Sequence, residues 1–101
     1  MRHEDNRRTL TEFGNGKDWR LCKVVIIKKD CVLGNHHHKE KDESFMLIKG
    51  TGYFNKEEMI LFKEYFVSRG TVHEFFLTEN SILISLATKE FDPDDEISNS
   101  N

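Results

Sequence analysis

Apolar residues occur in short runs along the chain, and glycine or polar residues interrupt these runs at intervals of about ten positions. The runs are rich in Val, Ile, Phe and Tyr, which are typical of β-strands. They predict strands at residues 19–27, 31–33, 44–49, 53–54, 59–62, 65–67, 72–77 and 81–88. The pattern therefore predicts an all-β fold, built as a sandwich or as a small antiparallel β-barrel of the jelly-roll type.

One segment, residues 56–66, has a second interpretation. Met59, Phe62 and Phe66 recur at intervals that also fit one face of a helix. Because the run from Ile60 to Phe62 suits a buried strand equally well, we predict a strand here and keep the helix as the alternative. The polar residues 55–58 before it are expected to form the tip of a hairpin.

Length and composition indicate one domain. The chain has 101 residues and a mass of 11.9 kDa, which is enough for a single core. We expect an N-terminal arm at residues 1–18, a barrel at 19–90 and an acidic, flexible tail at 91–101. The only proline, Pro93, lies in that tail.

Charge and hydropathy exclude several classes of function. The net charge is −3, and it changes only to +2 without the five acidic residues of 90–101, so the chain does not resemble a basic nucleic-acid-binding protein. It has no apolar run of about 20 residues and no hydrophobic leader, so we expect a soluble, cytoplasmic protein without a membrane partner. Cys22 and Cys31 are expected to be buried thiols.

Candidate chemistry is concentrated in the stretch from His36 to Glu43. On a strand, His36 and His38 project to one face, where two imidazoles can bind one metal ion. Glu43 lies at the start of the next predicted strand and can place its carboxylate beside these imidazoles. His73, in an apolar run further along the chain, can add a third imidazole. Three imidazoles and one carboxylate suit a divalent ion such as Fe, Mn, Ni, Zn or Cu.

Each of these residues also has a simpler interpretation. His36 and His38 can belong to a solvated turn, and His73 can be a hydrogen-bonded core histidine. Glu40 competes with Glu43 as the carboxylate, although its position in a charged turn favours solvent exposure. We expect His37 to face away from the site, and we expect most of the aromatic residues to lie in the core: Phe45, Tyr53, Phe62, Phe75 and Phe76.

The spacing of these residues resembles the cupin superfamily. The first cupin motif has His-x-His, three or four residues, Glu, six residues and Gly, and the chain matches it from His36 to Gly50. Gly34 lies too close to His36 to be the leading glycine of that motif. Of the second motif the chain keeps Gly70 and His73, whereas other positions depart from it: Phe62, Ser68 and Leu77.

The resemblance, which covers about residues 20–90, implies a small jelly-roll barrel with a metal ion or substrate in its mouth. It carries over His36, His38, Glu43 and His73 as the site residues. Two subgroups are similar in detail. The triple histidine is similar to the cupin domain of type II mannose-phosphate isomerases, and residues 86–95 are similar to the ending of sugar-nucleotide ketoisomerases of polysaccharide biosynthesis, which use a histidine pair as acid and base.

These observations predict a metal-binding cupin that acts on a carbohydrate, as an isomerase or epimerase with His36 and His38 as the catalytic residues. The expected cofactor is a divalent ion, Zn, Mn, Fe or Ni, and the expected ligand is a sugar phosphate or nucleotide sugar. A metal-dependent dioxygenase and a non-catalytic sugar- or partner-binding module are the alternatives. Exposed strand edges predict a homodimer.

Overall fold

The computed structural model describes residues 2–14, 16–38, 40–89 and 96–98; at positions 35–38 and 96–98 it describes the backbone only. All regular elements in these ranges are strands, so the all-β prediction is confirmed and the helix at residues 56–66 is wrong. No helix in the described ranges is long and apolar enough to span a bilayer.

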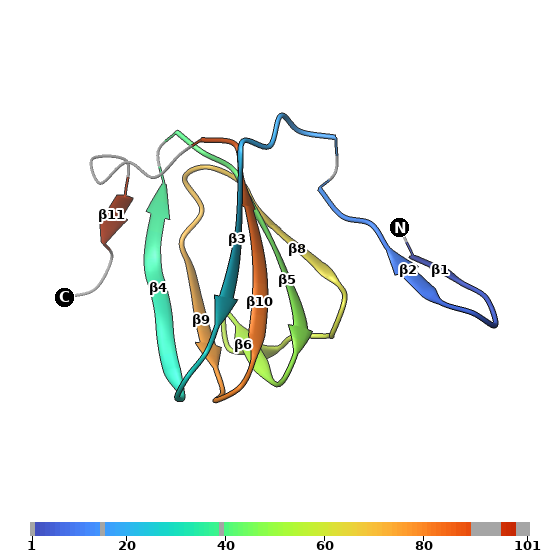
Figure 1. The fold of residues 1–101 in the computed structure, drawn as a ribbon. Helices are drawn as coiled ribbons and strands as arrows, with labels where there is room; N and C mark the ends of the chain where they lie inside the picture. The colour runs from blue at the N-terminus through green and yellow to red at the C-terminus, as the bar shows by residue number, and fades with distance from the viewer. Residues whose placement is uncertain (1, 15, 39, 90–95, 99–101) are drawn as a thin grey trace.

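Two antiparallel sheets face each other and form the body of the molecule (Figure 1). The four-stranded sheet has the order β3-β10-β5-β8, and the five-stranded sheet has the order β11-β4-β9-β6-β7. Among the described residues these sheets remain separate, which corrects the prediction of a closed barrel to a jelly-roll-like sandwich. The strands are β3 (Leu21–Ile26), β4 (Cys31–His38), β5 (Glu43–Lys49), β6 (Gly52–Phe54), β7 (Glu57–Glu58), β8 (Glu64–Val67), β9 (His73–Leu77), β10 (Ile82–Ala87) and β11 (Glu96–Ser98).

Both ends of the chain contain short strands. A hairpin of β1 (Arg2–Glu4) and β2 (Thr9–Thr11) occupies the segment expected to be an arm, and it stands to one side of the body (Figure 1). At the other end, β11 pairs with the last residues of β4. The remainder of the tail, residues 91–95 and 99–101, lies outside the described residues, as does residue 90 before it.

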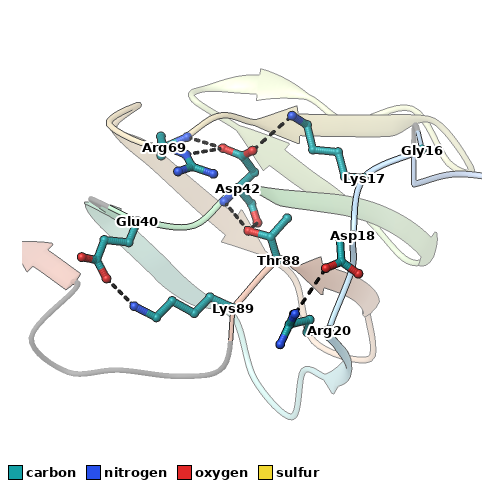
Figure 2. A pocket seen from close by; sticks show the side chains of 9 residues that line it. All are labelled: Gly16, Lys17, Asp18, Arg20, Glu40, Asp42, Arg69, Thr88 and Lys89. Atoms are coloured by element: carbon teal, nitrogen blue, oxygen red, sulfur yellow. Dashed lines mark hydrogen bonds and ion pairs between the residues drawn. The ribbon is translucent and has the colours of Figure 1, made fainter.

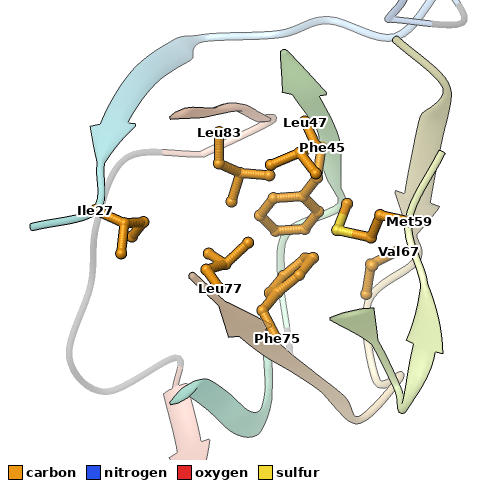
Figure 3. Close-up of a cluster of buried hydrophobic side chains, with 8 residues drawn as sticks. All are labelled: Ile27, Phe45, Leu47, Met59, Val67, Phe75, Leu77 and Leu83. Atoms are coloured by element: carbon orange, nitrogen blue, oxygen red, sulfur yellow. The ribbon is translucent and has the colours of Figure 1, made fainter. Parts of the chain in front are cut away.

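The core lies between the two sheets and is closed by aromatic and aliphatic side chains (Figure 3). Phe45 of β5 and Phe75 of β9 meet across the layers with ring centroids 4.7 Å apart, and Leu47 and Leu77 are fully buried. Along β9 the buried positions alternate with more exposed ones, whereas β5 is buried on both faces from Glu43 to Leu47. The core prediction is confirmed for Phe45 and Phe75, whereas Tyr53 is half-buried.

The segment from Met59 to Phe62 is a turn, so the strand predicted there is wrong. The amide of Met59 donates to the carbonyl of Gly52 at 2.8 Å, and the amide of Phe62 donates to the carbonyl of Leu47 at 2.9 Å. Phe62 has a φ of 64°, which no strand residue adopts. Met59 alone enters the core, while Ile60, Leu61 and Phe62 are exposed.

Cys22 is exposed, contrary to the sequence expectation, while Cys31 is half-buried. Cys22 lies on β3, the terminal strand of its sheet, where alternate residues face outward. The apolar run of this strand suggested burial on both faces, but Val24 and Ile26 on the same outer face are also exposed. Phe76, on the outer face of the other sheet, is likewise exposed and is not a core residue.

Candidate functional site

The predicted site residues come together at one end of the sandwich. β4 ends at His38, whereas β5 begins at Glu43 and β9 begins at His73. Antiparallel pairing brings these strand ends together: Glu43 lies opposite Ala87 of β10 and Val67 of β8. Position 36 of β4 lies opposite His73 of β9, and Nε2 of His73 lies 3.6 Å from Oε1 of Glu43, so these positions meet although they are distant in sequence.

A bulge in β4 sets the register of the histidines. Strand β4 pairs with β9 regularly from Cys31↔Leu77 to Gly34↔Glu74, and then shifts by one residue so that position 36 lies opposite His73. Gly34 has a φ of 99°, and a Cβ there would lie 2.8 Å from the carbonyl oxygen of His73. Only glycine fits this conformation and this close approach, so Gly34 permits the bulge.

The bulge decides which positions share a face with His73. Directly opposed residues of an antiparallel pair lie on the same face of the sheet. Continued without the shift, the regular pairing would place position 35 opposite His73, and positions 36 and 38 would then lie on the other face. With the shift, positions 36 and 38 alternate onto the face of His73, and position 37 lies on the opposite face.

His73 is buried, with a backbone carbonyl near one ring nitrogen and a carboxylate near the other. Only 2% of the residue is exposed. Its Nδ1 donates to the carbonyl of Thr71 at 3.3 Å, which leaves Nε2 directed at Glu43, whose Oε1 lies 3.6 Å away. Phe45 and Phe75 flank the ring at centroid distances of 5.7 and 6.0 Å. Hydrogen bonding at Nδ1 fixes the ring orientation and directs Nε2 toward the side of the ring where Glu43 lies.

Glu43 is the carboxylate that accompanies His73. It is buried and faces the interior of the sandwich, on the same side of β5 as Phe45. Glu40, the competing candidate, is exposed and forms an ion pair with Lys89. The structure therefore brings Glu43, rather than Glu40, to the buried histidine.

Asp42, the residue before Glu43, contacts residues from three other parts of the chain, a role that the sequence analysis missed. Its Oδ1 accepts hydrogen bonds from the Arg69 amide at 2.8 Å and Nε at 3.4 Å, and its Oδ2 lies 3.2 Å from Lys17 Nζ. The Thr88 hydroxyl accepts the Asp42 amide proton at 3.0 Å. Burial by itself would raise the pKa of the Asp42 carboxyl, but the hydrogen bonds from Arg69 and Lys17 outweigh it and lower that pKa.

A polar crevice of about 580 Å³ surrounds Asp42 at this end of the molecule (Figure 2). Four basic and three acidic side chains line it, and they form the ion pairs drawn in the figure. Asp42 immediately precedes Glu43, the first residue of β5, so the crevice lies at the end of the sandwich where β5 begins. The lining residues are Gly16, Lys17, Asp18, Arg20, Glu40, Asp42, Arg69, Thr88 and Lys89.

The metal site stays a prediction. Within the described side chains, no three His, Cys, Asp or Glu residues cluster in a way that would hold an ion. Two of the four predicted ligands, His36 and His38, lie where only the backbone is described. The other two, His73 and Glu43, are both buried, and Nε2 of His73 lies 3.6 Å from Oε1 of Glu43.

Comparison with solved structures shows a cupin-like fold. The chain is similar to a double mutant of the QdtA 3,4-ketoisomerase from Thermoanaerobacterium thermosaccharolyticum in complex with TDP, with 24% identity, a TM-score of 0.79 and coverage of 98% of this chain and 83% of that one. It is similar to WlaRA, a TDP-fucose-3,4-ketoisomerase from Campylobacter jejuni (13% identity, TM-score 0.80, coverage 98% and 84%). A 3,4-ketoisomerase from Helicobacter canadensis gives 19% identity, a TM-score of 0.80 and coverage of 98% and 86%.

No family model matches the chain, and no curated protein matches it. At these identities the structural likeness establishes the fold. The reaction that the chain catalyses is inferred from the residues of its site.

Proposed function

We propose that the chain is an isomerase or epimerase of a nucleotide-linked sugar and that it moves protons with histidine side chains. The observation that carries the proposal is the β4 bulge, which places position 36 opposite a buried histidine that is itself directed at a buried glutamate. Solved structures of the same fold include TDP-sugar 3,4-ketoisomerases and a 4-keto-6-deoxy sugar epimerase, which supports this reaction class.

The reaction needs a group that removes a proton from the carbon beside a carbonyl and a group that returns one. Imidazole is suited to both tasks, because its pKa lies near neutrality without tuning. We assign these roles to His36 and His38, which share a face of β4. His73 and Glu43 form the floor of the site and position the substrate carbonyl or the acting imidazole.

The proposed substrate, a nucleotide-linked sugar, has an anionic diphosphate. The crevice around Asp42 is suited to bind this diphosphate. It presents Lys17, Arg20, Arg69 and Lys89, and each of these cations is only partly covered by its carboxylate partner. Guanidinium and ammonium groups bind phosphate oxygens through charge-assisted hydrogen bonds. A ligand that spans the crevice and the His73 rim would therefore have an anionic part and a sugar part.

Solvent hydrogen exchange tests the proposed reaction directly. Incubated in heavy water with TDP-4-keto-6-deoxyglucose, the protein is expected to introduce deuterium at the carbon beside the carbonyl, because the abstracted proton exchanges with solvent before it is returned. Proton NMR of the recovered sugar nucleotide measures this. Tight binding of the nucleotide sugar without any exchange would contradict the enzyme and favour a sugar-binding module.

A divalent ion held by the same residues is the alternative to this acid–base pair, because an imidazole nitrogen that binds a metal ion cannot also accept a proton. His36, His38, Glu43 and His73 would hold Zn, Mn, Fe or Ni, and the ion would stabilise negative charge on the sugar oxygen. In that case, protein purified without nickel resin is expected to contain about one equivalent of such an ion by elemental analysis, and Glu43→Gln is expected to lose it. Metal-free protein with full exchange activity would assign the reaction to the histidines alone.

A further inference from the structure

Lys41, in the loop between β4 and β5, is a buried lysine. Only 3% of the residue is exposed, although lysine side chains in folded proteins almost always remain in water. The two residues after it, Asp42 and Glu43, are buried as well. A buried ammonium group is unfavourable unless an opposite charge or hydrogen-bond acceptors lie against it. The position of Lys41 therefore calls for a partner.

The described part of the chain supplies no partner for this ammonium group. None of the hydrogen bonds and ion pairs made by side chains of the described residues includes Lys41. The carboxylates on either side of it in sequence are already engaged, because Glu40 pairs with Lys89 and Asp42 pairs with Arg69. Lys41 thus differs from its neighbours, whose charges are balanced within the fold.

The backbone beside Lys41 is held in place. The amide of Asp42 donates to the Thr88 hydroxyl at 3.0 Å, and the amide of Thr88 donates to the carbonyl of Asp42 at 3.1 Å. The amide of Arg69 donates to Oδ1 of Asp42 at 2.8 Å. These bonds come from the end of β10 and from the loop before β9, and they anchor the peptide that joins Lys41 to Asp42. The burial of Lys41 therefore belongs to the fold and not to a freely moving loop.

Lys41 stands between two residues that line the crevice around Asp42, namely Glu40 and Asp42 itself (Figure 2). The side chains that line this crevice include four cations and three carboxylates, so one positive charge is left unbalanced. Lys41 adds a second positive charge that has no carboxylate of its own among the described residues. The diphosphate of a nucleotide-linked sugar carries one negative charge on each phosphate, which matches this excess.

We propose that Lys41 binds the diphosphate of the sugar nucleotide through its ammonium group, and that the ligand supplies the counter-charge that the described chain does not. The identity of the ligand rests on the function proposed above, whereas the burial of Lys41 does not depend on any reaction. A phosphate oxygen attracts a desolvated ammonium group more strongly than a hydrated one, because water no longer screens the two charges. Folding removes the water from Lys41 in advance, and ligand binding then recovers the interaction.

Lys41→Met tests this assignment, because methionine keeps the length of the side chain and removes its charge. The parent protein is expected to bind TDP, and the variant is expected to bind it about 10- to 100-fold more weakly, the effect of losing one hydrogen bond between charged groups. Isothermal titration calorimetry measures both affinities.

Lys49→Met is the matched control for the binding experiment. Lys49 is exposed at the far end of β5, so the same charge is removed where salt screens it from the crevice. Its affinity for TDP is expected to stay within about twofold of the parent protein. Equal affinities of the two variants would overturn the proposal. A parent protein that binds neither TDP nor inorganic pyrophosphate would overturn it as well.

Thermal unfolding without ligand separates a binding role of Lys41 from a structural one. The melting temperature of Lys41→Met is expected to equal or exceed that of the parent protein, because the variant no longer buries an unpaired charge. A melting temperature lower by more than about 4 °C would show that Lys41 has a stabilising partner within the chain, and would overturn the proposal. Weaker TDP binding by Lys41→Met, with no deuterium exchange by the parent protein, would refute the proposed reaction and support the role of Lys41.

Discussion

Replacing His36 or His38 with Asn is expected to reduce turnover of the keto-sugar nucleotide by about 10²–10⁴-fold, the range typical for loss of a general acid or base. Asn keeps a polar side chain of similar size but cannot accept and release a proton near neutral pH. The loss should appear in kcat, with KM changed by a much smaller factor, because the proton moves in the transition state and substrate binding uses other groups.

His37 provides the matched control for this pair. It lies between the two candidate residues in sequence, but the alternation of β4 puts its position on the opposite face. His37→Asn is therefore expected to retain turnover to within about threefold, below the smallest effect ascribed to a catalytic acid or base. If all three variants were equally impaired, the effect would come from the strand as a whole, and the assignment of an acid–base pair would be wrong.

The two histidines also predict different partial reactions. If one residue removes the proton and the other returns it, the variant that keeps the base should still exchange the proton beside the carbonyl with solvent while forming no isomerised product. The variant that lacks the base should do neither. Deuterium incorporation and product formation, measured by NMR in the same sample, separate the two roles.

The predicted site residues lie at strand ends of the structure: β4 ends at His38, β5 begins at Glu43 and β9 begins at His73. His36, His38, Glu43 and His73 carry fixed spacings that survive in a single sequence, and antiparallel strands of similar length must bring their ends together. The register in which β4 pairs with β9 was harder to predict from the sequence. Gly34 was interpreted as the end of a strand, whereas β4 continues through it to His38 with a bulge. A glycine inside a strand run was the available signal for that bulge.

The errors in the fold share a physical cause. Sequence patterns report that a residue is apolar, but they do not report whether the fold supplies a neighbour to cover it. Residues 60–62 form an apolar run that resembles a buried strand, yet backbone hydrogen bonds from Met59 and Phe62 make it an exposed turn. Cys22 and Val24 belong to a β-rich run, yet they face outward on a terminal strand.

Asp42 was missed for a different reason. It stands in a run of charged residues, 39–43, that is typical of a solvated turn, and its partners Lys17, Arg69 and Thr88 are distant in sequence. Only the tertiary fold brings these groups to the same carboxylate. Long-range polar contacts of this kind have no periodicity and no fixed spacing, so one sequence does not reveal them.

Asp42→Asn is expected to lower the free energy of unfolding by about 2 kcal/mol, the scale of a buried hydrogen bond to a charged group. The Asp42 side chain is only 7% exposed, whereas Lys17 and Arg69 are 40% and 57% exposed, so the cations can return to water once the carboxylate is gone. This partial solvation keeps the expected loss below the 3–5 kcal/mol typical of a fully buried ion pair. Thermal unfolding should shift down by roughly 8–16 °C.

Asp18→Asn is the control, because it removes the same chemical group from an exposed pair. Asp18 and its partner Arg20 have side chains 84% and 67% exposed, and such a pair contributes at most about 0.5–1 kcal/mol. A melting temperature that changes by less than a few degrees is therefore expected. Equal destabilisation by the two variants would show that the contacts of Asp42 contribute no more to the free energy of unfolding than an exposed ion pair does.

The pH dependence provides an independent check on the same carboxylate. The pKa of Asp42 is lowered in the folded protein, so its contribution to stability is fully present above the pKa of the unfolded chain, about 3.9, and is lost as the pH falls through the lower folded value. The stability difference between the parent protein and Asp42→Asn should be constant above about pH 5 and should shrink below about pH 4. Urea unfolding at a series of pH values measures this. A difference that stayed constant down to pH 3 would mean that the charge on Asp42 does not hold Lys17 and Arg69 at the rim.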